Sequence, residues 1–131
     1  MKKLIYFLTA VLALSFTSCK ENQEKRLINE LTSGEWVCNR IVSYWLENGK
    51  YQSETSFATI HLRLYEDKTF TMTTGDDYVS GSWILNNTQL LLSPSNSGET
   101  RNCTIQDHSS THLLLRWNYD NGYSDYEFYI R

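Results

Sequence analysis

Two of the three histidines in the chain, His108 and His112, lie four residues apart. Histidines at this spacing bind a zinc ion together when they share one face of a helix. Here they flank the turn-forming run 109–111 at the start of an expected strand, with Asp107 as the further ligand type nearby. We therefore predict a solvated hairpin and no metal site. The third histidine, His61, stands alone at an outward strand position and is expected at the surface.

The acidic and hydroxyl side chains show no catalytic spacing. Asp76-Asp77 and the run from Asp120 to Asp125 offer loop oxygens, but without the Asp-x-Asp-x-Asp-Gly order of a calcium loop. The serines form no Gly-x-Ser-x-Gly elbow, and no cysteine adjoins a histidine as nucleophile and base. The sequence therefore predicts no catalytic residues, no enzyme activity and no cofactor.

One of the three cysteines, Cys19, closes an N-terminal segment with the features of a bacterial export signal. Lys2 and Lys3 precede an apolar run of about 13 residues, which is in the signal-peptide range and short of the roughly 20 that span a bilayer. The small residues Thr17 and Ser18 before Cys19 resemble a lipobox, which implies cleavage after residue 18 and a diacylglycerol on the Cys19 thiol. The alternative is a secretory signal cut elsewhere, with Cys19 as an ordinary thiol.

The remaining cysteines, Cys38 and Cys103, would be exported to a compartment where disulfides persist. A bond between them would close a 65-residue span and contribute up to about 4 kcal/mol in the chain-entropy model. Both also fall at inward strand positions, which fits two buried free thiols equally well. The sequence leaves both interpretations open.

The charge of the mature chain argues against a nucleic-acid partner. Two of the 12 Lys and Arg residues lie in the signal, so 10 remain against 15 Asp and Glu, a net charge of about −5. The arginines are also scattered singly and do not cluster on one face, as phosphate binding requires. We expect attachment to the outer membrane through the lipid on Cys19, with the domain facing the periplasm or the cell surface.

The periodicity of apolar residues changes once along the chain. Leu27, Ile28 and Leu31 share one face of a short helix, expected over residues 24–31 and ended by Thr32-Ser33-Gly34. Beyond Gly34 the apolar period is two to the end of the chain, as in half-buried strands. In the first strand this alternation places Trp36, Cys38, Arg40, Val42 and Tyr44 on one face.

Short turns separate the expected strands, which number eight. We place them at residues 36–45, 60–65, 70–72, 80–85, 89–92, 103–105, 113–117 and 126–130. Sequential hairpins favour an eight-stranded antiparallel up-and-down barrel, the size that side chains fill or that holds one small ligand. The predicted organisation is a signal peptide at 1–18, a lipidated cysteine, tether and helix at 19–33, and a barrel at 34–131.

Four short motifs carry a family resemblance. They are Leu31 to Trp36, with Gly34 two residues before Trp36, Tyr65 to Phe70, Gly81 to Leu85, and Leu90 to Leu92. In this order and spacing they resemble the lipocalin-like lipoprotein domains of Bacteroidetes, over residues 31–131. The resemblance implies a calycin-type small barrel with the helix near its base, where the Trp36 indole packs. It implies no catalytic residue.

Aromatic residues are abundant, with four Trp and eight Tyr in the mature chain. Those with core phase would, together with Met72, largely fill the barrel: Trp36, Phe70, Trp83, Trp117 and Phe128. Others fall at strand ends or turn tips, where they form a candidate binding rim or, alternatively, cross-strand pairs on the outer face: Tyr44 or Trp45, Tyr51, Tyr78, Tyr119 and Tyr123. We therefore expect a non-catalytic domain that binds a small apolar molecule or a partner protein. The alternative is an inhibitor or an accessory subunit of an envelope complex that acts through rim loops.

Overall fold

The structure is a computed structural model that describes residues 21–96 and 98–131. The signal sequence and Cys19 lie outside the described residues. Among the described residues, no helix has the length and apolar character needed to cross a membrane.

The N-terminal helix (residues 21–31) covers one end of the barrel. It buries Leu27 and Leu31, two of the apolar positions that predicted it. The Thr32 hydroxyl donates to the carbonyl of Ile28 at 2.8 Å as the helix ends. The Trp36 indole Nε1 donates to the carbonyl of Leu31 at 3.0 Å, so the first strand and the end of the helix are fixed to each other. The expected packing of Trp36 beneath the helix is confirmed.

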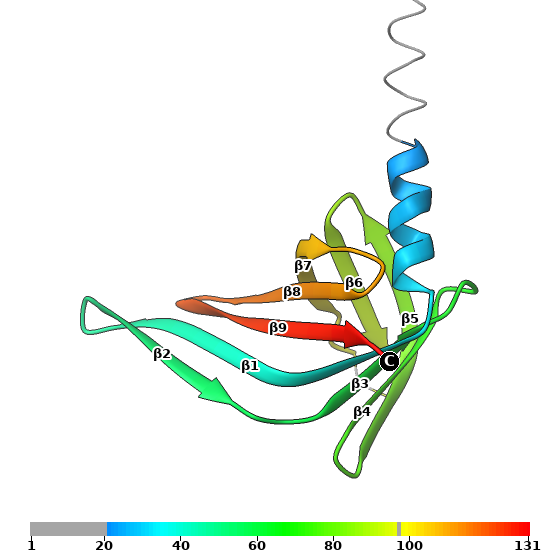
Figure 1. Cartoon of the computed structure of the whole chain (residues 1–131). Coiled ribbons are helices and arrows are strands. Elements are labelled where there is room, and N and C mark those ends of the chain that lie inside the picture. The colour runs from blue at the N-terminus through cyan, green and yellow to red at the C-terminus, as the bar shows by residue number, and fades with distance from the viewer. Residues whose placement is uncertain (1–20, 97) are drawn as a thin grey trace, which may run out of the picture.

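Nine antiparallel strands follow the helix (Figure 1). They are β1 (Glu35–Glu47), β2 (Lys50–Ser56), β3 (Ile60–Leu64), β4 (Thr69–Thr74), β5 (Asp77–Asn86), β6 (Gln89–Pro94), β7 (Arg101–His108), β8 (His112–Tyr119) and β9 (Gly122–Ile130).

Eight of these strands close the barrel, and β1 is the strand that joins its two edges. One side of β1 pairs with β9 from Trp36 to Trp45. On the other side, β3 pairs with the first residues of β1 and β2 pairs with its second half, Ile41 to Glu47. The closed all-β barrel with one short helix confirms the predicted fold class.

Strand β2 was not expected from the sequence. Its seven residues are all exposed, so they lack the alternation of apolar and polar side chains by which the other strands were found. Its pairing with β1 extends a hairpin beyond the body of the barrel (Figure 1).

A β-bulge in β1 corrects the expected alternation of that strand. The register with β9 shifts between Cys38 and Arg40, so one extra residue enters the strand. Trp36 and Cys38 face the core as expected, but beyond the bulge Ile41 packs against the core instead of Arg40. The prediction that Arg40, Val42 and Tyr44 continue the inward face was therefore wrong.

One apolar core lies in the closed part of the barrel. Among the described residues, its buried members all lie between Leu27 and Phe128, so we expect residues 21–131 to fold by themselves. Trp36 and Trp83 are fully buried, and the Trp83 indole donates to the carbonyl of Tyr65 at 2.9 Å. The core members are Leu27, Leu31, Trp36, Cys38, Ile60, Leu62, Leu64, Phe70, Trp83, Leu90, Leu92, Cys103, Ile105, Leu113, Leu115 and Phe128.

Candidate functional site

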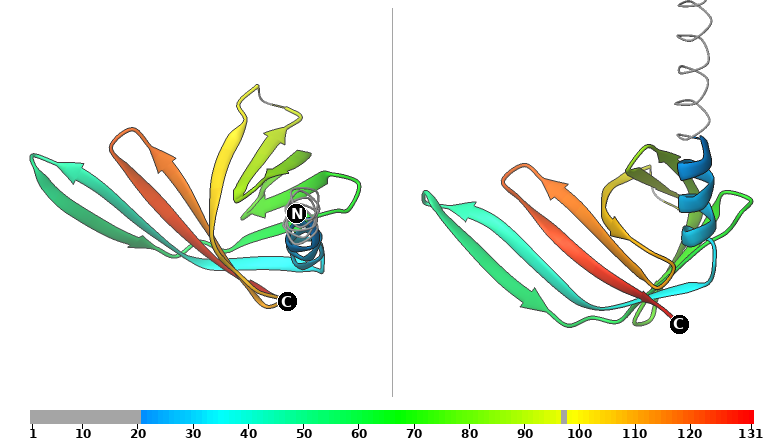
Figure 2. Two further views of the ribbon diagram at one scale, coloured as in Figure 1. Left: turned by 90° about the horizontal axis from the view of Figure 1, so that it is seen from above. Right: turned by 45° about the horizontal axis from the view of Figure 1, so that its top comes forward.

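The two ends of the barrel differ. The helix lies at one end, the base, beside the turns β5–β6 and β7–β8 (Figure 2). Because the strands are antiparallel, the turns β1–β2, β4–β5 and β8–β9 lie at the opposite end, the mouth. The long hairpins β1–β2 and β8–β9 reach furthest out at this end.

A cavity of about 280 Å³ lies inside the barrel. Most of its lining is apolar and comes from strands on all sides. Four lining side chains carry polar groups that hydrogen-bond or bear charge: Thr74, Arg101, Trp117 and Tyr126. The rest of the lining consists of Ile41, Ala58, Ile60, Leu62, Met72, Leu92, Cys103, Leu115 and Phe128. An apolar pocket with a few polar groups is the usual form of a small-molecule site.

Arg101 is the charged member of this lining. It begins β7 in phase with Cys103 and Ile105, which are both buried. Its guanidinium carbon lies 5.0 Å from the ring centre of Trp117 on β8, within the range of a cation–π interaction. In the sequence, Arg101 is one of several singly scattered arginines, although its alternation with Cys103 and Ile105 could have placed it inside.

Tyr126 faces the cavity from β9. Burial, followed by the neighbouring Tyr119 hydroxyl, raises the pKa of the Tyr126 phenol above its usual value. The phenol is therefore neutral over the physiological range and keeps its proton.

Three hydroxyl groups lie close together on the mouth side of Tyr126. Ser124 is buried, and its Oγ lies 2.8 Å from Ser43 Oγ on β1 and 2.9 Å from the hydroxyl of Tyr119 on β8. The three side chains join β1, β9 and β8 on the inner face of the barrel. Neither serine was predicted as part of a site. The bulge that turns Ser43 inward left no signal in the apolar pattern, whereas Ser124 shares the inward phase of Tyr126 and Phe128 but is not apolar.

The two cysteines of the barrel are free thiols in the structure. Cys38 lies on β1 and Cys103 on β7, with β8 and β9 between these strands. The sequence left open a disulfide or two buried free thiols, and both cysteines are buried and unbonded in the structure. Burial raises the pKa of both, and raises that of Cys103 to about 11.

We expect both thiols to resist alkylation in the folded protein. Because the pKa values are raised, the reactive thiolate is scarce at pH 7 to 8 and forms only as the pH approaches the raised values. Residues 21–131 should show no iodoacetamide adduct by mass spectrometry at pH 7.5, and two adducts after unfolding in denaturant. An adduct in the folded state would contradict the burial, and a mass two hydrogens low would show a disulfide.

The five residues predicted for a binding rim lie at the mouth but on two faces. Trp45 and Tyr119 share the inner face, in phase with Ser43 and Trp117. Tyr51, Tyr78 and Tyr123 have the opposite phase and face outward. The structure therefore does not bring the five together into one surface.

Tyr123 belongs to a cluster on the outer face. Its ring centre is 4.9 Å from that of Tyr44, and the Arg116 guanidinium lies 3.9 Å from the Tyr123 ring. Arg116 also makes two hydrogen bonds to Asp125, of 2.8 and 3.0 Å. This is the cross-strand pairing that the sequence analysis left open as the alternative for the aromatic residues.

The three histidines bind carboxylates outside the cavity. His61 is hydrogen-bonded to Glu35, and His108 Nδ1 lies 2.6 Å from Glu30. His112 lies between two carboxylates, 3.5 Å from Asp107 and 3.4 Å from Glu127. In residues 21–96 and 98–131, no group of three His, Cys, Asp or Glu side chains is arranged to hold a metal ion.

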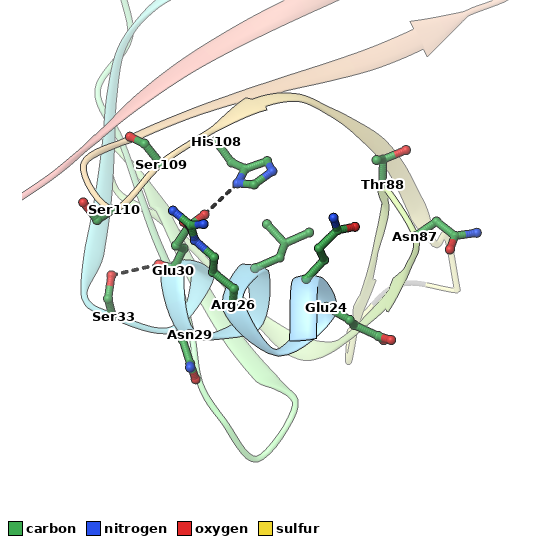
Figure 3. Close-up of a pocket in the computed structure, with 12 residues that line it drawn as sticks. Glu24, Arg26, Asn29, Glu30, Ser33, Asn87, Thr88, His108, Ser109 and Ser110 are labelled. Atoms are coloured by element: carbon green, nitrogen blue, oxygen red, sulfur yellow. Dashed lines mark hydrogen bonds and ion pairs between the residues drawn. The ribbon is translucent and has the colours of Figure 1, made fainter. Parts of the chain in front are cut away.

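A second, wider pocket of about 930 Å³ lies at the base, between the helix and the turns beside it (Figure 3). His108 reaches across it to Glu30, and Glu30 also lies 3.5 Å from Arg26 on the same helix. These polar contacts dock the helix on the barrel. The side chains that line this pocket are mostly exposed, and the charged groups of Glu30 and Arg26 already contact each other or His108. We therefore take the barrel cavity as the candidate site.

Comparison with known proteins identifies the fold. No family model matches the sequence, and no curated protein matches it. A lipocalin-like protein from Bacteroides uniformis matches the structure with a TM-score of 0.55 and 15% sequence identity, covering 78% of this chain and 99% of the other. An uncharacterized protein from Bacteroides eggerthii matches with a TM-score of 0.50 and 15% identity, covering 75% and 98%. The chain thus has a lipocalin-like fold, as the sequence motifs implied.

Proposed function

We propose that this lipocalin-like chain is a non-catalytic binding protein of the cell envelope that holds a small apolar molecule in its barrel. The observation that carries the proposal is the 280 Å³ cavity with its largely apolar lining. This volume is close to the lower end of small-molecule pockets, about 300 Å³. The barrel is therefore incompletely filled, although Trp36, Trp83 and Phe70 are packed inside it.

The chemistry of the lining supports binding without catalysis. None of the lining residues is a histidine or a carboxylate that could move a proton. The one thiol among them, Cys103, has a pKa of about 11 and is a poor nucleophile at neutral pH. Lipocalin-like folds are also typically binding domains.

The position of the helix supports a lipid anchor at Cys19. Glu21, the first described residue, lies two positions after Cys19 and belongs to the helix at the base. Two residues span at most about 7 Å, so an anchor on Cys19 would hold the base near the membrane and leave the mouth free. We propose the outer membrane as the location, as the lipobox-like signal implies.

The anchor is tested with Cys19→Ser in the full chain. Without the thiol no lipid can attach, so we expect the variant to move from the membrane fraction to the soluble fraction. Retention of the variant in the membrane would overturn the lipid anchor. Cys38→Ser is the control, because it also removes a thiol but should leave the fractionation unchanged.

The cavity is tested by filling it. Ala58 lines the cavity, whereas its neighbour Thr59 is exposed. Residues 21–131, exported behind a cleavable secretory signal and purified from the envelope without detergent, should release a small molecule in native mass spectrometry. Ala58→Phe should lose this molecule and Thr59→Phe should keep it. A wild-type domain without any bound molecule, or one whose ligand survives Ala58→Phe, would argue against binding in the barrel.

The hairpin β1–β2 favours a second candidate, a partner protein bound at the mouth. Strand β2 stands at the end of the sheet order and has one neighbour, so its other edge is open to a strand from a partner. Tyr51 and Phe57 beside this edge are 87% and 81% exposed. A photo-cross-linking residue at Gln52 should then capture a single envelope protein that the same residue at Ile84, exposed on β5, does not capture.

A further inference from the structure

Arg101 has no acidic partner in the chain. Of the six arginines in the sequence, Arg26, Arg116 and Arg131 form ion pairs, and Arg101 forms none among the described residues. The residues that the structure does not describe, 1–20 and 97, contain no Asp or Glu. No carboxylate side chain of the chain therefore lies within ion-pair distance of Arg101.

The place of Arg101 makes this unpaired charge unusual. Its Cα partner on β6 is Leu92, and its side chain lines the cavity together with Leu92, Cys103 and Trp117. A charge beside an apolar cavity loses part of its hydration, which is unfavourable unless a partner replaces the water. The ring of Trp117 at 5.0 Å replaces a part of it, but the ring cannot accept the directed hydrogen bonds of the guanidinium.

Two hydroxyls line the same cavity. They belong to Thr74 at the end of β4 and Tyr126 on β9. A hydroxyl can donate a hydrogen bond to an anion, and the phenol of Tyr126 is neutral and thus keeps its proton for this purpose. The cavity combines one cation, two hydroxyls and the indole N–H of Trp117 with apolar walls, and its lining contains no Asp or Glu.

We propose that the ligand of the cavity is an amphiphile with one anionic head group, held by Arg101, and an apolar tail that lies among Ile60, Leu62 and Leu115. This inference rests on the binding function proposed above and names the class of ligand. The guanidinium suits a carboxylate or a phosphate, because its N–H groups bind two oxygens at once.

The cavity also limits the length of the tail. A volume of 280 Å³ corresponds to roughly nine water-sized volumes of about 30 Å³ each. With one non-hydrogen atom in each, the tail has about eight carbons. Octanoate is therefore a suitable probe, and octanol and octylammonium have the same number of carbon atoms with a neutral and a cationic head.

The test is calorimetric titration of residues 21–131 with these three probes at pH 7.5. We expect octanoate to bind at least tenfold more tightly than octanol, and octylammonium to bind most weakly. Octyl phosphate in a fourth titration tells the two anionic head groups apart. Tighter binding of either anion than of octanol supports the inference.

Arg101→Gln should remove the preference for the anion and leave the affinity for octanol within about twofold. Arg101→Lys, which keeps the charge, should retain part of the preference. The control is Arg63→Gln: Arg63 also lacks an ion pair and lies over an aromatic ring, 5.3 Å from Tyr65, but it is exposed on β3. This variant should bind octanoate as the wild type does.

The outcomes separate the two proposals. Equal binding of octanoate and octanol, unchanged in Arg101→Gln, would overturn the anionic head group and leave the cavity function standing. Tighter binding of octylammonium would do the same. Failure of all four probes to bind would overturn the cavity function together with this inference.

Discussion

Trp36→Ala should cause a large loss of stability, about 3 to 5 kcal/mol in the free energy of unfolding. The Trp36 side chain extends from β1 and is fully buried. Its indole donates to the carbonyl of Leu31, at the end of the helix, at 3.0 Å. Truncation leaves a cavity and also leaves that carbonyl without its partner. Since small domains unfold with about 5 to 15 kcal/mol, this loss is a large part of the total.

The measurement is denaturant unfolding of residues 21–131, followed by circular dichroism. Trp36→Phe separates the two causes, because it keeps most of the apolar volume and removes the indole donor. It should lose about 1 to 3 kcal/mol. Trp45→Ala is the matched control: Trp45 is partly exposed near the tip of β1, and the variant should lose about 1 kcal/mol or less. A Trp36→Ala domain as stable as the Trp45→Ala domain would contradict the packing at the base.

The base of the barrel could be predicted from sequence because local signals and core packing agree there. Leu27 and Leu31 showed the helical period, Gly34 marked its end, and Trp36 opened the period of two. The same residues make the contacts that join the helix to β1. Each local preference therefore points to the arrangement that the whole fold requires.

The mouth could not be predicted in the same way. A bulge at Asn39 reverses the inward face of β1, and a bulge depends on the pairing of two distant strands. It brings Ser43 to Ser124, 81 residues later in the chain. The fully exposed β2 gave no alternating apolar signal, because it packs against no core.

The candidate site shows the limit of judging residues by type. Arginine is mostly a surface residue, so Arg101 counted as one of several scattered charges. Its strand phase, shared with Cys103 and Ile105, was present in the sequence and outweighs residue type in a closed barrel. Inward charges in strands of this kind are therefore worth testing as ligand contacts.

Gly122→Ala should open the seam that closes the barrel at the mouth. A Cβ on Gly122 would lie 2.0 Å from the carbonyl oxygen of Tyr44 and 2.7 Å from the Cα of Trp45. Both are backbone atoms of β1, so β9 and β1 must move apart. Because overpacking of this kind costs about 1 to 3 kcal/mol, we expect a loss of about 2 kcal/mol in the free energy of unfolding.

The loss should be concentrated at the mouth. The amide of Leu46 donates to the carbonyl of Asn121 at 2.9 Å beside Gly122, so its hydrogen exchange reports on this seam. A local loss of about 2 kcal/mol corresponds to roughly thirtyfold faster exchange. Amides at the base, such as that of Ile130, which donates to Thr111, should change less.

Gly98→Ala is the control for this substitution. Gly98 lies in the loop between β6 and β7, where a Cβ would meet nothing within 4 Å. This variant should unfold as the wild type does. Equal stability of the Gly122→Ala and Gly98→Ala domains would show that β1 and β9 do not lie as close at the mouth as the structure has them. In that case the cavity, whose wall includes Ile41 and Tyr126 from these same two strands, would be wider than 280 Å³.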